Sequence, residues 1–168
     1  MTPEEAGGNF ILGIGEISIR GIDGTYERPE SSSIYEDWGP MAPETQSMEI
    51  RRWLVELTDL SGAVIPVGDL STHAVWYGPT LASKSMNIGI SIVNDFRGKG
   101  IGSIAQRMLA EELHREGVVR VEAGTDVSNI SEQRSLLKAG FVLEGVLRQA
   151  QGRADGLHDL QVWSHISQ

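Results

Sequence analysis

The stretch Asn87–Ser103, which reads NIGISIVNDFRGKGIGS, decides the fold. Its first part, residues 87–93, alternates isoleucine with small residues and predicts a strand that has one nearly bare face. Its second part is rich in glycine and leads into residues 104–113, where apolar side chains recur at helical spacing. A helix N-terminus that follows a glycine-rich turn presents unpaired N–H groups and a partial positive charge. The stretch therefore predicts an anion-binding turn between a strand and a helix.

Two common phosphate-binding motifs do not fit this turn. A Walker A loop needs Ser or Thr after its lysine, whereas Lys99 is followed by Gly100. In a dinucleotide fingerprint the third glycine comes one residue later than Gly102, and the motif lies in the first strand–helix unit of its domain. A tight turn that binds no ligand stays open as an alternative.

Composition sets limits on the function. The chain has 168 residues, 40% of them hydrophobic, no cysteine and a formal net charge of −9. This acidity argues against nucleic acid as a partner, and the lack of cysteine excludes disulfides and thiolate metal sites. The acidic start of the sequence does not resemble a signal peptide, and no apolar run approaches the ~20 residues of a membrane span. We expect a cytoplasmic protein without a membrane partner.

The order of predicted elements indicates a mixed α/β domain. Strands are expected at 16–22, 53–57, 63–67, 73–77, 87–93, 118–123, 141–147 and 160–164. A bend at Gly68-Asp69 separates two of them. The first helix ends at Gly117, and the second runs from Asn129, with Glu132 completing a capping box, to Gly140. We predict one domain over 1–168, with a loose tail at 1–15 and an acceptor-side loop or flap at 23–47.

Two separate motifs carry a family resemblance. The strand 88–93 with Arg97-Gly98-Lys99-Gly100-Ile101-Gly102 resembles the acyl-CoA pyrophosphate loop of the GNAT acyltransferase superfamily. Asn129, followed by LLKAGF at 136–141, and the HD pair at 158–159 are similar to the RimJ/RimL branch, the ribosomal-protein N-acetyltransferases. The resemblance spans about residues 50–168 and is poor over 23–47. It implies a GNAT fold with a mixed, mostly antiparallel sheet that is splayed between strands 88–93 and 118–123 and flanked by helices.

The resemblance also implies a donor and its binding residues. The donor would be acetyl-CoA or another acyl-CoA, and an acceptor amine would attack its thioester directly. Backbone groups of Ile92 and Val93 would bind the pantetheine arm, and Asn129 would contact the same arm. The pyrophosphate would be bound by Arg97, Gly98, Lys99, Gly100, Ile101, Gly102 and Ser103. No metal is implied.

The groups that would move protons are less clear from the sequence. Leu136 stands where many relatives have an acidic tyrosine, and Gln151 stands where a carboxylate is expected. The remaining candidates for a catalytic base are Glu122, Asp126 and His158. Each has a structural alternative: ion pairing of Glu122 with Arg120 or Arg148, a turn role for Asp126, and a hydrogen bond between His158 and Asp159. An N–H near Val93 would polarise the thioester carbonyl.

A missing base favours an acceptor amine of low pKa. At pH 7 about 1 in 2500 amines of pKa ~10.4 is neutral, which costs about 4.6 kcal/mol, whereas an α-amine of pKa ~8 costs only about 1.4 kcal/mol. We therefore expect an α-amine or a small-molecule amine as the acceptor. One alternative is a donor tethered to an acidic carrier protein, which would dock on a basic patch made of Arg97, Lys99, Arg107, Arg134 and Lys138. The other is a non-catalytic CoA-binding module. A homodimer is left open.

Overall fold

The computed structural model describes residues 10–12, 15–17, 48–58, 60 and 62–167. The chain divides into two units, Met1–Asp37 and Trp38–Gln168. The first contains the short strands β1 (Phe10–Leu12) and β2 (Gly15–Ile17), which pair in antiparallel fashion. This hairpin replaces part of the loose tail predicted for 1–15. The strand predicted at 16–22 is described only as far as Ile17, and the predicted flap at 23–47 lies outside the described residues.

The second unit contains a six-stranded sheet in the order β3-β4-β5-β6-β8-β7. Its strands are β3 (Arg51–Thr58), β4 (Val64–Trp76), β5 (Lys84–Ile92), β6 (Arg120–Asp126), β7 (Val142–Arg153) and β8 (Gly156–Ile166). Two short 3-10 turns, Leu81–Ser83 and Asn94–Phe96, flank β5. Every neighbouring pair is antiparallel except β5 and β6. The mixed, mostly antiparallel sheet expected from the sequence is confirmed.

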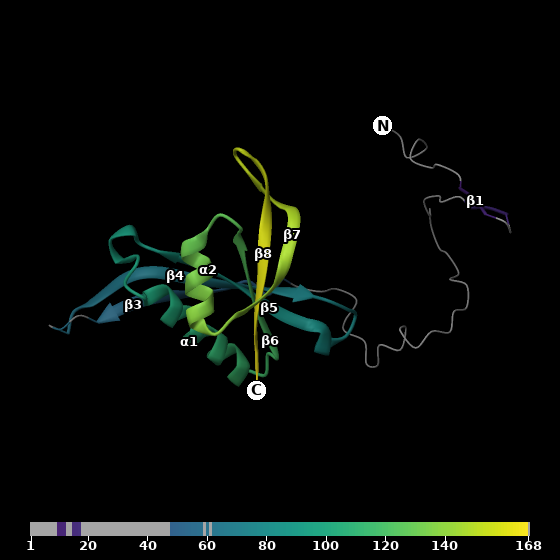
Figure 1. Cartoon of the computed structure of the whole chain (residues 1–168). Coiled ribbons are helices and arrows are strands. Elements are labelled where there is room, and N and C mark those ends of the chain that lie inside the picture. The colour runs from purple at the N-terminus through teal and green to yellow at the C-terminus, as the bar shows by residue number, and fades with distance from the viewer. Residues whose placement is uncertain (1–9, 13–14, 18–47, 59, 61, 168) are drawn as a thin grey trace. The chain divides into compact units, whose positions relative to one another are not determined.

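The parallel pair β5–β6 is short. It covers only Met86–Ile88 against Val121–Ala123, although β5 continues to Ile92 and β6 to Asp126. The strands therefore diverge at their carboxyl ends, as predicted. Figure 1 shows the result: β3 and β4 run across the view, while β7 and β8 run almost upright.

Two helices, α1 (Ile101–Arg115) and α2 (Ile130–Ala139), follow β5 and β6 respectively and lie next to each other (Figure 1). The buried positions of α1 have helical spacing and pack on the sheet, which is the typical behaviour of an amphipathic helix. The core combines both helices with the central strands. Its buried apolar side chains are Leu70, Ala74, Met86, Ile88, Ala105, Leu109, Ala110, Leu113, Val121, Ala123, Leu136, Ala139, Phe141 and Trp163.

The bend predicted at Gly68-Asp69 is wrong, because β4 is a single strand from Val64 to Trp76. Pro66 and Gly68, which in the sequence suggest a break, have a different role in the strand. The pairing of β4 with β3 shifts by one residue between Pro66 and Gly68, which is a β-bulge, and proline is tolerated at such a position because no ladder N–H is required. On its other side Gly68 approaches β5 closely: a Cβ at this residue would lie 2.2 Å from the carbonyl oxygen of Ser91. The glycine thus permits close strand contact and does not end the strand.

This contact predicts the effect of substituting Gly68. Gly68→Ala should destabilise the fold by about 1–3 kcal/mol, since backbone must move to make room for the methyl group. Gly145→Ala is a matched control, because Gly145 also lies in a strand and a Cβ there meets nothing within 4 Å. Chemical denaturation of both variants measures the difference. Equal stability of the two variants would contradict the close approach of β4 and β5.

Candidate active site

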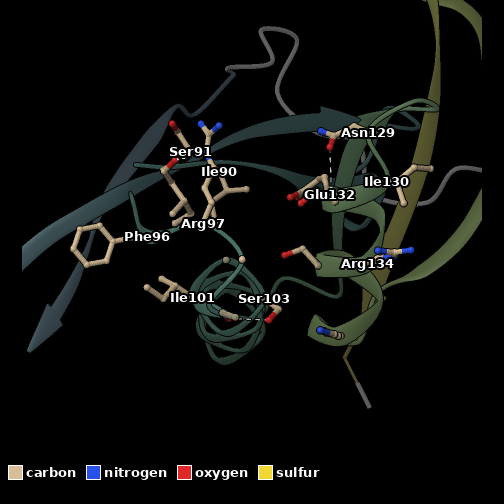
Figure 2. Close-up of a pocket in the computed structure, with 17 residues that line it drawn as sticks. Ile90, Ser91, Phe96, Arg97, Ile101, Ser103, Asn129, Ile130, Glu132 and Arg134 are labelled. Carbon is tan, nitrogen blue, oxygen red and sulfur yellow. Dashed lines mark hydrogen bonds between the residues drawn. The ribbon is translucent and has the colours of Figure 1, made fainter. Parts of the chain in front are cut away.

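A cavity of about 590 Å³ opens where β5 and β6 diverge. Its wall comes from three sources: the end of β5, the turn 96–103 that leads into α1, and one side of α2 from its cap Asn129 to Lys138. Figure 2 shows Phe96 and Arg97 on one side of the cavity, with Asn129, Glu132 and Arg134 on the other. The glycine-rich turn and the start of the second helix, which are some 30 residues apart in the chain, therefore face one space.

The turn has the geometry of an anion site. Gly98 and Gly100 have φ values of +71° and +82°, a region that favours glycine, and Gly100 is the N-cap of α1. The first turn of α1 carries no acidic residue, so no carboxylate of this turn competes for its unpaired N–H groups. Arg97 is held beside them by a hydrogen bond of 2.7 Å from its Nε to the carbonyl oxygen of Ile92.

The opposite wall is fixed by contacts between the helices. Asn129 caps α2, because its side-chain oxygen accepts a hydrogen bond of 3.2 Å from the N–H of Glu132. The predicted capping box is only half formed, since the side chain of Glu132 accepts instead from Gln106 of α1. Gln106 is buried, and its amide oxygen accepts a hydrogen bond of 2.9 Å from the hydroxyl of Ser135. This buried glutamine, which the sequence analysis did not single out, holds α2 against α1.

Burial gives Glu132 an unusual environment. Desolvation raises its pKa above the ordinary range, and the hydrogen bond from Gln106 opposes that shift. Glu132 lines the cavity together with three cations, Arg97, Arg134 and Lys138. The cavity therefore combines a net positive charge with a carboxyl group that is easier to protonate than an exposed one.

Eight of the ten residues predicted to bind the donor lie on the cavity wall: Ile92, Arg97, Gly98, Gly100, Ile101, Gly102, Ser103 and Asn129. Lys99 instead lies over the ring of Phe96, with its Nζ 5.2 Å from the ring centroid. Ser131, Arg134, Ser135 and Lys138 were not predicted as donor-binding residues, although they also line the cavity. Their helical spacing after Asn129 is the signal that places them on one face of α2.

Val93 is placed differently from the expectation. Its N–H donates a hydrogen bond of 2.9 Å to the carbonyl oxygen of Val67 on β4, so it is already paired. In an antiparallel ladder, successive residues of a strand direct their N–H groups alternately toward one neighbouring strand and the other. The N–H groups of Ile90 and Ile92 therefore point away from β4. They point to the side on which β6 has diverged. Donors for a carbonyl are therefore found at Ile90 and Ile92, and the role predicted for Val93 would require its present bond to break.

Glu122 is the first of the three predicted bases. Its buried carboxylate accepts hydrogen bonds from the Tyr77 hydroxyl at 2.8 Å, the Ser85 hydroxyl at 3.0 Å and the Arg120 Nε at 2.5 Å. Arg120 also binds Glu144. Three donors occupy the carboxylate, and this environment matches the structural alternative, the ion pair with Arg120. Arg148 is not a partner of Glu122 among the described residues.

Asp126 and His158, the other two predicted bases, contact each other. One oxygen of Asp126 accepts from the N–H (2.8 Å) and the hydroxyl (2.6 Å) of Ser128, and the other accepts from His158 and, at 3.1 Å, from Arg153. The far nitrogen of His158 lies 2.9 Å from Asp155. The predicted His158–Asp159 bond does not form, since Asp159 accepts from the N–H of Gln149. The cluster ties the end of β6 to the β7–β8 hairpin.

The protonation states of this cluster disfavour a base. The bonds from Ser128, followed by that from His158, hold the pKa of Asp126 far below its usual range. The bond to Asp126 in turn raises the pKa of His158, with Asp155 adding to the effect. The two aspartates favour the cationic form of His158, and a histidine cation has no lone pair with which to accept a proton from an amine.

Comparison with known proteins identifies the family. A model described as "Acetyltransferase (GNAT) domain" matches residues 12–142. The chain belongs to this GNAT acetyltransferase family, as its sequence motifs and its diverging strands predicted. No curated protein matches the chain.

Solved structures agree with this fold. The microcin C7 self-immunity acetyltransferase MccE, in complex with acetyl-CoA and AMP, is 28% identical over 61% of this chain and 55% of its own, with a TM-score of 0.52. RimL, the ribosomal L7/L12 α-N-protein acetyltransferase in complex with CoA, is 22% identical over 70% and 62% (TM-score 0.55). Mycobacterium smegmatis RimJ is 24% identical over 65% and 50% (TM-score 0.55). The chain thus spans little more than half the length of the first of these structures.

Two further findings concern other kinds of site. No helix in the described part of the chain is long and apolar enough to cross a membrane. Over the same residues, no group of three or more His, Asp or Glu side chains is arranged to hold a metal ion.

The Asp126–His158 contact predicts how stability depends on pH. The lowered pKa of Asp126 contributes stability above the unfolded value of about 4, and this contribution is lost as the pH falls below it. The raised pKa of His158 contributes stability below about 6.5, lost as the pH rises through the folded value. The contact should therefore raise the melting temperature of the wild type most between about pH 4 and 6.5, relative to variants that lack it.

Thermal melts of wild type, Asp126→Asn and His158→Gln across pH 3–9 measure this gain. Both variants should melt several degrees lower than wild type at pH 5.5, and the differences should shrink toward both ends of the range. Asp155→Asn is a milder control because Asp155 is largely exposed. A difference from wild type that stays constant over the whole range would show that the contact is not ionic.

Proposed function

We propose that the chain transfers an acetyl group from acetyl-CoA to a primary amine. The observation that carries this proposal is the cavity that brings the turn 97–103 and Asn129 together where β5 and β6 diverge, in a member of the GNAT family. The acetyl-CoA bound to MccE supports the choice of donor. For that reason we favour transfer of an acetyl group over transfer of other acyl groups. The cytoplasmic location stays a prediction.

The donor site follows from the geometry of the cavity. The diphosphate of CoA would lie against the N–H groups at the start of α1 and beside Arg97, where the helix dipole and the guanidinium both favour negative charge. The pantetheine arm would extend along β5, with the backbone N–H groups of Ile90 and Ile92 open to it. Asn129 would bind the arm through its amide nitrogen, because its oxygen caps α2.

The reaction would proceed by direct attack. The neutral amine nitrogen forms a bond to the thioester carbon, the C–S bond breaks, and the CoA sulfur leaves as a thiolate, which takes up the proton that the nitrogen loses when the amide forms. A thiol of pKa ~8.5 is a tolerable leaving group without an acid. An N–H of Ile90 or Ile92 would stabilise the negative charge that develops on the carbonyl oxygen. Most of the acceleration would come from holding amine and thioester in line.

The acceptor is proposed to be an α-amine or another amine of low pKa. The support is the environment of the three predicted bases: Glu122 is occupied by three donors, and Asp126 and His158 are bound to each other. Without a strong base, the enzyme depends on the fraction of acceptor that is already neutral. The resemblance to the RimJ/RimL branch points to the same kind of acceptor, a protein or peptide α-amine.

Arg97 provides the first test of the donor site. Arg97→Ala should weaken the binding of acetyl-CoA and CoA at least about tenfold, because a charge-assisted bond to phosphate contributes roughly 1.5–3 kcal/mol. Titration calorimetry measures the affinity. Arg115→Ala is the matched control, since it removes the same charge at the far end of α1, where Arg115 pairs with Glu112. Unchanged affinity in Arg97→Ala would sink the assignment of the turn.

Acceptor choice provides a second test. We expect a peptide with a free N-terminus to be acetylated at pH 7 much faster than one with a blocked N-terminus and a single lysine. The neutral fractions of the two amines differ by about 250-fold. Release of free CoA thiol measures both rates. Rapid acetylation of lysine would refute the low-pKa acceptor, and the absence of turnover with any amine would favour a non-catalytic CoA-binding module.

A further inference from the structure

The cavity contains more positive charge than its glycine-rich turn requires. Besides Arg97, it is lined by Arg134 and Lys138, which stand one turn apart on α2. Like charges at this spacing repel each other and destabilise a helix. Neither side chain forms an ion pair or hydrogen bond with another residue in the part of the chain that the structure describes. A ligand with negative charge at this wall would relieve the repulsion.

These two cations are held in place by α1. A guanidinium nitrogen of Arg107 donates to the carbonyl oxygen of Lys138, which fixes the last turn of α2. Gln106, one residue earlier on α1, binds Glu132 and Ser135 on either side of Arg134. The position of Arg134 and Lys138 relative to the glycine-rich turn is therefore set by contacts between the two helices and does not depend on a surface loop.

We propose that Arg134 and Lys138 bind a second phosphate of the donor, the phosphomonoester on the ribose of CoA, and thereby make the site selective for free CoA. The inference rests on the proposed function, since it concerns the same cavity. The glycine-rich turn and Arg97 would form one anion site, and the two cations of α2 would form another. Figure 2 shows Arg134 across the cavity from Arg97.

The count of charges favours CoA over a carrier-bound donor. CoA has a diphosphate and a separate phosphomonoester, whereas the phosphopantetheine arm of a carrier protein has one phosphodiester. A single phosphodiester would be satisfied by Arg97 and the N–H groups of α1, and the repulsion between Arg134 and Lys138 would remain. Among the described residues Glu132 is the one carboxyl residue on the cavity wall; its side chain is hydrogen-bonded to Gln106 and forms no ion pair with either cation.

The experiment compares three ligands by titration calorimetry at fixed ionic strength: CoA, dephospho-CoA, which lacks only the ribose phosphate, and 4′-phosphopantetheine. The proteins are wild type, the double variant Arg134→Gln/Lys138→Gln, and the control double variant Arg52→Gln/Arg115→Gln. The control removes the same charge from exposed sites outside the cavity. Thermal melts establish that each variant is folded.

We expect wild type and the control to bind CoA at least about tenfold more tightly than dephospho-CoA, as one charge-assisted contact would give. The Arg134→Gln/Lys138→Gln variant should lose this preference and still bind dephospho-CoA like wild type. If wild type binds CoA and dephospho-CoA equally, or binds 4′-phosphopantetheine as tightly as CoA, the inference is wrong and the proposed function stands. If none of the three ligands binds, the donor site itself is wrong and both proposals fail.

Discussion

The short parallel pairing between β5 and β6 is the constraint on which the rest of this structure depends. Three residue pairs join the strands, and four residues of β5 then continue alone. Backbone N–H and C=O groups must find partners, so strand edges that part inside a sheet leave groups available for a ligand. The other edge of β5 is paired with β4 without interruption up to Val93, and Gly68 permits the close contact there. Only the edge that faces β6 is open.

The two helices convert this open edge into a pocket. α1 begins directly after the end of β5 and α2 directly after the end of β6, so both helix N-termini lie at the site where the strands part. Their partial positive charges act in the same direction as Arg97, Arg134 and Lys138. A chain with a formal charge of −9 thus concentrates positive charge at one cavity. That local field, and not the net charge, decides which ligand the protein can take.

Much of this could be predicted from the sequence. The alternating isoleucines and the glycine-rich turn are strong local signals. The structure has the strand β5 and a cavity-lining turn at these positions. The capping role of Asn129 is equally local. The errors are of another kind. Gly68 was interpreted as a break, because nothing in the sequence reveals that β5 passes 2.2 Å from a would-be Cβ. Gln106 was missed, because its partners lie 26 and 29 residues away on another helix. Long-range packing decides such positions.

The same reasoning explains why the catalytic residues were the hardest to predict. Glu122, Asp126 and His158 are the residue types that act as bases, and their types alone made them candidates. In the fold, each is engaged by partners: Arg120 for Glu122, and Ser128, Arg153 and His158 for Asp126. The bonds to Asp126 hold its pKa below the usual range, so this carboxylate has little tendency to take a proton. These buried charges join β6 to its neighbouring elements. We therefore expect catalysis to depend on how the two substrates are positioned.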